Sequence, residues 1–148
     1  MSKYRFRLET LQKLRSAHRD QLRGALADAY RAEQILSEQR TALRDEVAEL
    51  RDARRAALTG AGINVNQVLE AQRYGMVLDA QQQLLSEQSH RLAVEVERRR
   101  LAVVEADRSV RVLEKLDEQR RAEHRKQEER AEHKELDEIA VMRHPRTR

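Results

Sequence analysis

The sequence contains no cysteine, no tryptophan, one proline, one phenylalanine and four glycines among 148 residues. Without cysteine the chain can form no disulfide, no thiolate metal site and no cysteine nucleophile, which fits a reducing compartment. So few aromatic side chains leave little bulk for a thick globular core. Disordered chains are usually rich in proline and glycine. These shortages therefore indicate long regular elements with a narrow apolar seam.

Long hydrophobic runs are missing as well. No apolar stretch approaches the roughly 18 residues that a membrane-spanning helix needs. Three basic residues, Lys3, Arg5 and Arg7, stand near the start, but no apolar run follows them, so we expect no secretory signal. The sequence predicts a soluble, cytoplasmic protein.

What is abundant is typical of helices. Alanine, glutamate, lysine, leucine and arginine make up 85 of the 148 residues, above the roughly one-half that is typical of coiled coils. The 30 basic and 26 acidic residues alternate along the chain. This mixing is characteristic of solvated helix faces.

Apolar residues recur at intervals of seven in the first half of the chain. The repeat consists of Leu22, Ala29, Leu36, Leu43, Leu50 and Ala57. A weaker stripe continues in the second half through Leu78, Leu85, Leu92, Val96, Val103, Ala106, Val110 and Leu113, and Ser89 and Arg99 fall on it. A strict heptad predicts paired helices, and polar residues on the stripe can set their register.

Three of the four glycines lie in one stretch between the two stripes, GAGINVNQVLEAQRYG at residues 60–75. Gly60 or Gly62 can end a helix in the left-handed conformation, and Asn64 or Asn66 can cap the next one. We therefore predict an all-α fold, a single antiparallel coiled-coil hairpin over residues 1–148. Its helices span about 6–58 and 66–142 around a turn at about 59–65, with a short helix or kink possible near Gly75.

Helix lengths predict an overhang. At 1.5 Å per residue the helices measure about 80 and 115 Å, so with a turn near residue 62 the second helix outruns the first beyond about Leu116. From Glu114 to Glu135, 15 of 22 residues are charged. Pairs four residues apart can keep such a helix formed without a partner.

The segment LDEIAVMRH, Leu136 to His144, ends this charged helix on apolar residues. Leu136, Ile139 and Met142 recur every three residues, beyond the reach of the first helix. An apolar helix face with no intramolecular seam to join is a docking face for a partner. The start of the chain, YRFRLETL, lies at the same end of the hairpin.

Motifs for chemistry are weak. GAGINV lacks the third glycine of a dinucleotide site and follows no strand, so a turn is the better interpretation. His124 with Glu128, and Glu129 with His133, could each present two metal ligands, but no third ligand is near. We predict no catalytic residue, no cofactor and no metal, and therefore no enzyme. Arginines 98–100 are locally basic, yet interleaved acids disfavour nucleic-acid binding.

Three stretches of this chain resemble the FliJ family of flagellar export proteins: YRFRLETLQKLR near the start, GINVNQVLEAQRYGMVL in the middle and KELDEIAVMR near the end. The resemblance implies a non-enzymatic stalk of the flagellar type III export apparatus, peripheral at the cytoplasmic face of the inner membrane through its partners. The implied partners are the hexameric export ATPase, the transmembrane export-gate protein and export chaperones.

Carried onto this sequence, the resemblance implies two sets of binding residues. Tyr74 and Leu78 match positions that engage the export gate. The ATPase-binding set consists of Phe6, Leu8, Leu11, Leu136, Asp137, Glu138, Ile139, Met142 and Arg143. Two alternatives remain at this point: the equivalent stalk of a virulence type III secretion system, and a coiled-coil scaffold or nucleic-acid-binding protein.

Overall fold

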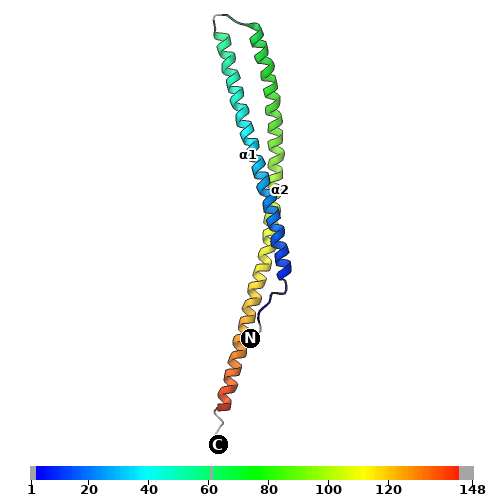
Figure 1. The fold of residues 1–148 in the computed structure, drawn as a ribbon, viewed down its shortest axis with the longest axis vertical. Helices are drawn as coiled ribbons and strands as arrows, with labels where there is room; N and C mark the ends of the chain where they lie inside the picture. Colours follow the sequence, from blue (N-terminus) through cyan, green and yellow to red (C-terminus); the bar gives the residue numbers. More distant parts are fainter. Residues whose placement is uncertain (1–2, 61, 144–148) are drawn as a thin grey trace. The chain divides into compact units, whose positions relative to one another are not determined.

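The fold is an all-α hairpin, as predicted. The computed structural model describes residues 3–60 and 62–143. Two antiparallel helices, α1 (Glu9–Thr59) and α2 (Val65–Arg143), lie side by side (Figure 1). The helical bounds differ from the predicted ones by one to three residues.

Contacts divide the chain into two compact units. The turn unit comprises residues 22–103 and the terminal unit comprises residues 1–21 and 104–148. The buried side chains of the turn unit are Ala29, Leu36, Leu43, Leu78 and Val96, and those of the terminal unit are Ala106, Val110 and Leu113. All eight lie on the predicted stripes, so each unit is held by a narrow seam one side chain wide.

Cross-helix contacts show the register. In the terminal unit the Arg19 guanidinium lies 3.7 Å from a carboxylate oxygen of Asp107. In the turn unit Arg99 donates a hydrogen bond to the backbone oxygen of Ala25 at 2.6 Å. Both pairs are centred on residues 62 to 63, so the helices pair about the predicted turn.

Polar side chains close the two helix ends at the turn. The Thr59 hydroxyl donates to the backbone oxygens of Arg55 and Ala56 at 3.0 and 3.3 Å. The Asn64 side chain accepts from the backbone amides of Asn66 and Gln67 at 3.1 and 3.4 Å, which is an N-cap. One of the two predicted capping residues, Asn64, therefore fills that role.

The prediction that Gly60 or Gly62 ends the first helix in the left-handed conformation is wrong. Neither Gly60 nor Gly62 has a positive φ, and the other described residues have none either. The Thr59 hydroxyl instead donates to two carbonyl oxygens in the last turn of α1, and one of them, that of Ala56, has no partner within the helix.

Gly75 lies inside α2, which runs unbroken from Val65, so no separate short helix follows the turn. A Cβ atom at this position would meet the Leu50 side chain at 3.5 Å, an ordinary contact distance. An alanine would therefore fit at this position, and Gly75 does not interrupt α2.

The first helix begins at Glu9, because residues 3–6 have no regular secondary structure and residues 7–8 form a turn. The N-terminal segment lies against α2, where Tyr4 contacts Asp117 and His124. Half-buried residues of α2 extend to Glu128, so the overhang begins near residue 129 and not at 117.

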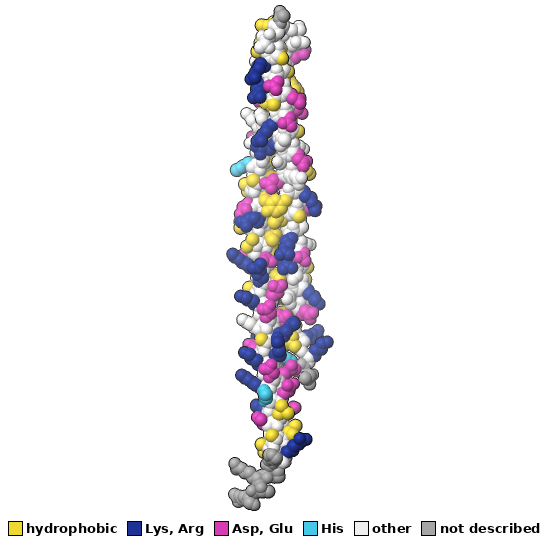
Figure 2. Space-filling view, turned by 90° about the vertical axis from the view of Figure 1, so that its left-hand side faces the viewer, with side chains coloured by type: hydrophobic (Ala, Val, Ile, Leu, Met, Phe, Trp, Pro, Cys, Tyr) yellow, Lys and Arg dark blue, Asp and Glu magenta, His cyan; other side chains and the backbone are white. Residues whose placement is uncertain are grey.

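Charge covers the surface around the seam. Figure 2 shows Lys and Arg side chains interspersed with Asp and Glu side chains, with hydrophobic side chains among them. The charged faces match the alternation in the sequence. The apolar side chains that remain exposed are therefore the candidates for a functional site.

Candidate functional site

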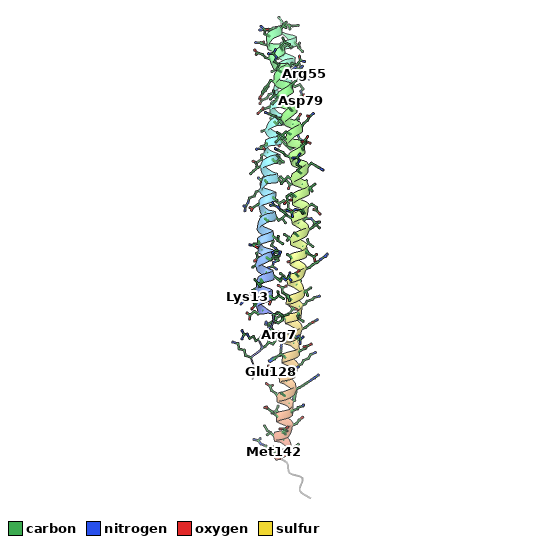
Figure 3. All side chains as sticks on the ribbon, turned by 90° about the vertical axis from the view of Figure 1, so that its right-hand side faces the viewer. Arg7, Lys13, Arg55, Asp79, Glu128 and Met142 are labelled. Atoms are coloured by element: carbon green, nitrogen blue, oxygen red, sulfur yellow. The ribbon has the colours of Figure 1, made fainter. Side chains whose placement is uncertain are left out.

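The first candidate surface is the C-terminal surface, which we define by six residues at the end of α2: Leu136, Asp137, Glu138, Ile139, Met142 and Arg143. All six are exposed, and the exposed fraction reaches 62% for Leu136 and 78% for Met142. Figure 3 shows Met142 near the end of α2. Large apolar side chains that stay in water within a few turns of one helix mark an interaction site.

The stretch that carries this surface has no partner segment. Every residue from 129 to 143 is exposed, so no other described part of the terminal unit buries it. Helical structure persists there through local interactions, of which the ion pair between Asp117 and Arg121 at 3.2 Å is an example in the preceding turns. The C-terminal surface is therefore preformed and accessible.

The N-terminal members of the predicted ATPase-binding set lie elsewhere. Phe6 lines a hollow of about 460 Å³ together with Asp117 and Arg121 of α2, and Phe6 and Leu8 are half-buried while Leu11 is exposed. Along α2 the distance from Asp117 to Leu136 is about 28 Å at 1.5 Å per residue. The structure therefore divides the nine residues into two groups.

Tyr4 fastens the N-terminal segment to α2, a role that sequence reasoning missed. Its hydroxyl donates to a carboxylate oxygen of Asp117 at 2.8 Å, and its ring meets the His124 ring edge-on at 5.6 Å between centroids. The Arg121 guanidinium lies 5.5 Å from the Tyr4 ring centre. Burial, followed by the hydrogen bond to Asp117, raises the pKa of Tyr4. No sequence signal joins residues 113 positions apart.

The second candidate surface lies near the turn, where the two predicted gate-binding residues differ. Tyr74 is about half exposed, and its hydroxyl donates to a carboxylate oxygen of Glu46 at 3.1 Å. This hydrogen bond and the Glu46 charge raise the pKa of Tyr74. Leu78 is only 1% exposed, so it packs in the seam between the helices and offers almost no surface to a partner.

Two hollows flank the turn. A groove of about 620 Å³ is lined by apolar side chains such as Leu50 and Met76, by Arg51, Arg54 and Arg55, and by Asp79. A smaller cavity of about 220 Å³ lies between the helix ends, lined by Ala53, Arg54, Ala57, Leu58, Gln67, Val68 and Ala71. The small alanine side chains leave this space unfilled, so the seam is thinner here than farther from the turn.

The basic run at residues 98–100 is neutralised locally. Arg98 and Arg99 both donate to the Glu95 carboxylate, at 2.6 and 2.8 Å, and Arg100 donates to Glu97 at 2.8 Å. The hydrogen bonds from Arg98 and then Arg99 lower the pKa of Glu95 to about 2. Guanidinium groups held by carboxylates are poorly placed to take up phosphate.

The predicted polar residues of the stripe do lie at the helix interface. Arg99 is half-buried, and besides its bond to Glu95 it donates a hydrogen bond to the Ala25 backbone oxygen. The Ser89 hydroxyl accepts a hydrogen bond from Arg40 at 3.2 Å. Both contacts join α1 to α2 within the turn unit. They satisfy polar groups that would otherwise interrupt the apolar seam.

Metal and membrane-spanning features were also sought in the described residues. His124 lies 3.6 Å from Glu128, but residues 3–60 and 62–143 contain no group of three potential ligands. Within the same ranges, neither helix has a stretch apolar and uncharged enough to span a bilayer.

One comparison with known proteins is informative. The family model described as "Flagellar FliJ protein" matches residues 3–148, nearly the full length of the chain. No curated protein and no solved structure gives a significant match.

Proposed function

The chain belongs to the FliJ family of flagellar proteins, and from that premise we propose that it is a non-enzymatic stalk of the flagellar type III export apparatus. In this role it docks into the hexameric export ATPase and contacts the transmembrane export gate, and so promotes export. It also engages export chaperones. The family favours the flagellar apparatus over a virulence secretion system.

A single observation carries the proposal: the C-terminal surface is apolar, helical and exposed. Leu136, Ile139 and Met142 lie on a stretch of helix that no other described residue of the terminal unit covers. An amphipathic helix inserted in an apolar groove is a recurring mode of recognition. We assign the ATPase contact to this surface first, with Asp137, Glu138 and Arg143 as its polar rim.

Phe6, Leu8 and Leu11, the N-terminal residues of the predicted ATPase-binding set, have a supporting part in this proposal. Phe6 lies against α2 near Asp117, about 28 Å before Leu136, and Leu8 is half-buried nearby in the chain. If the ATPase ring contacts both the N-terminal residues and the C-terminal surface, it must extend about 28 Å along α2. Otherwise these residues act by holding the base of the overhang, with Tyr4 as the main contact.

Co-purification with the cognate export ATPase tests the proposal. We expect Leu136→Ala/Ile139→Ala to lower recovery of the ATPase at least about fivefold, since truncated anchor residues typically cost more than 1 kcal/mol each. Truncation after Glu135 should abolish stimulation of ATP hydrolysis. The matched control is Leu84→Ala/Leu101→Ala, two leucines of similar exposure on the same helix. Equal recovery for all three proteins would refute the assignment.

The gate contact is tested separately. Tyr74→Ser removes an exposed ring beside the turn, and we expect weaker binding to the cytoplasmic part of the gate protein. Tyr30→Ser is the control because Tyr30 is exposed to a similar degree, 46% against 48%. If binding to the gate protein survives Tyr74→Ser and is lost with Tyr30→Ser, the gate-binding surface does not lie near the turn.

A further inference from the structure

The turn carries a group of exposed apolar side chains that the proposed function does not use. We define the tip surface as Leu58, Ile63, Val65 and Leu69 together with Arg54 and Arg55. The exposed fractions of the four apolar residues run from 46% for Leu69 to 64% for Val65. A cluster of this kind on a hydrophilic protein marks an interaction site.

Charge at the tip surface has one sign. No acidic residue occurs between Ala53 and Leu69, in a chain with 26 acidic residues. Arg54 and Arg55 are exposed, and among the described residues neither has an ion pair, in contrast to Arg98 and Arg100. Figure 3 shows Arg55 on α1 close to the turn. The tip surface is thus complementary to an anionic partner.

The spacing between the arginines and the turn matches the depth of a lipid headgroup layer. Arg54 and Arg55 precede Thr59, the last residue of α1, by five and four residues, which is about 6 to 8 Å along the axis. Each headgroup layer of a bilayer is about 5 to 8 Å thick. With the helices steep to the bilayer, the guanidinium groups lie at phosphate depth when Ile63 and Val65 reach the acyl chains.

Backbone groups at the turn are prepared for a less polar environment. The Asn64 side chain accepts from two amides at the start of α2, and the Thr59 hydroxyl donates to two carbonyl oxygens at the end of α1. Unsatisfied backbone groups oppose entry into lipid. These side chains lower the penalty where the helix ends would otherwise expose such groups.

Neither hollow near the turn accounts for the outermost apolar residues. Arg54 and Leu58 line both the groove beside Arg51 and the cavity between the helix ends, and Arg55 lines the groove, but neither hollow includes Ile63 or Val65. Ile63 lies in the connection between the helices, and Val65 is the first residue of α2. Apolar residues at the end of a hairpin suit a planar layer better than the groove of a partner helix.

We propose that the tip surface docks directly on an anionic phospholipid bilayer. Ile63 and Val65 insert shallowly, and Arg54 and Arg55 bind lipid phosphates. A few apolar side chains combined with basic residues give reversible interfacial binding. The inference goes beyond the stalk function and does not rest on it, because it concerns lipid and not a protein partner.

Vesicle flotation with the full chain tests the proposal. The probe is phosphatidylcholine vesicles containing about one-third phosphatidylglycerol, and pure phosphatidylcholine vesicles are the reference. We expect binding to the anionic vesicles to exceed the reference at least about tenfold. Binding should fall several-fold as NaCl rises from about 0.05 to about 0.5 M, because salt screens the arginines. Equal binding to both vesicles, or none, would overturn the proposal.

Two pairs of variants locate the binding. Ile63→Asp/Val65→Asp should lower binding at least about tenfold, and an acid at the first turn of α2 is compatible with the helix dipole. Its control, Leu14→Asp/Val112→Asp, places the same charges at residues of equal exposure outside the turn. Arg54→Gln/Arg55→Gln should lower binding several-fold, and Arg125→Gln/Arg130→Gln controls for net charge.

Helix content by circular dichroism shows that each variant folds. If the control pairs lose as much binding as the tip variants, the effect belongs to overall charge and the proposal is wrong. A second outcome would also contradict the proposal. In that outcome the wild type does not bind vesicles, but the cytoplasmic part of the gate protein protects Ile63 and Arg55 from chemical labelling or hydrogen exchange. The tip surface would then bind a protein partner and not lipid.

Discussion

At the scale of single residues, this protein depends on a few buried side chains. Leu78 and Val110 are the two large side chains that are almost completely buried in the described structure, at 1% and 0% exposure. In a thick core the loss of one side chain is shared among many neighbours. In a two-helix seam it removes a whole layer of contacts, so individual seam positions should be sensitive to truncation.

We expect Leu78→Ala to lower the free energy of unfolding by about 2 to 4 kcal/mol, because a buried leucine leaves a cavity in a seam with little material to refill it. Urea denaturation followed by circular dichroism measures the change. Leu84→Ala is the control, since Leu84 is 55% exposed on the same helix, and its effect should stay within about 0.5 kcal/mol. Equal losses would place Leu84 and Leu78 in the same environment, contrary to the structure.

Glu95 gives a prediction on pH. Hydrogen bonds from Arg98 and Arg99 lower its pKa from 4.5 to about 2. A lowered pKa in the folded state means that the carboxylate stabilises the fold above pH 4.5, and that this contribution disappears as the pH falls through about 2. Glu95→Gln should therefore shift the urea midpoint most above pH 4.5 and progressively less toward pH 2.

The control for Glu95 is Glu105→Gln. The Glu105 carboxylate makes one exposed ion pair, with Arg108 at 3.5 Å, and we expect a smaller shift of the urea midpoint from its loss. A constant difference between wild type and Glu95→Gln at every pH would contradict the role of the arginine contacts.

At the scale of elements, the two helices differ in how they are held. All three buried residues of α1 lie in the turn unit, whereas α2 carries seam residues in both units and then continues beyond them. The last fifteen residues of α2 are exposed on every side. Their stability comes from local pairs alone, and isolated helices are marginal in water.

Hydrogen exchange measures that difference. We expect backbone amides of residues 129–143 to exchange orders of magnitude faster than amides near Val96 and Val110, because opening them breaks no seam contact. Addition of the export ATPase should slow exchange specifically in the former stretch. Slow exchange there without a partner would indicate that the stretch is already covered.

Gly75 offers a second test on α2. Replacement of a mid-helix glycine by alanine is favourable by about 0.5 to 1 kcal/mol where the space allows. The new Cβ would lie 3.5 Å from the Leu50 side chain, whereas Gly24 has nothing within 4 Å. We expect both Gly75→Ala and Gly24→Ala to raise the urea midpoint. If Gly24→Ala raises the urea midpoint and Gly75→Ala lowers it, the packing around Leu50 cannot adjust to the added Cβ atom.

At the scale of the whole molecule, one chain supplies both sides of its own seam. The heptad stripes of α1 and α2 face each other within each unit, so folding needs no second copy. Many two-helix coiled coils are dimers whose stability rises with concentration. In a hairpin the turn replaces that dependence, because the connecting residues hold the two helices at high effective concentration.

The thermal midpoint should therefore stay constant over about a hundredfold range of protein concentration. Circular dichroism at 222 nm measures it, with analytical ultracentrifugation as a parallel record of mass. A midpoint that rises with concentration would show that a second copy contributes to the seam.

Sequence reasoning captured much of the architecture, for identifiable reasons. The heptad from Leu22 to Ala57 and the weaker apolar stripe from Leu78 to Leu113 predicted both helices, because the spacing of apolar residues is a local property of the chain. Asn64 was among the predicted caps. The left-handed glycine was wrong, since the choice between Gly60, Gly62 and a side-chain solution at Thr59 depends on competing hydrogen bonds that composition does not rank.

The candidate sites divide in the same way. Helix lengths alone predicted that Leu136 and Met142 lie beyond the first helix, although the N-terminal segment moves the start of the overhang to about residue 129. Burial of Leu78 was implicit in its heptad position. By contrast, the placement of Phe6 far from Leu136 depends on the non-helical course of residues 3–6 and on the contact of Tyr4 with Asp117.

By itself, then, the sequence determined an all-α hairpin with a charged surface and an apolar end, because periodicity, glycine placement and helix rise are properties of neighbouring residues. Only the tertiary structure decided which apolar residues remain in water. Exposure depends on contacts between residues far apart, such as Tyr4 with Asp117 and Tyr74 with Glu46. Such contacts arise from three-dimensional register, which local pattern does not encode.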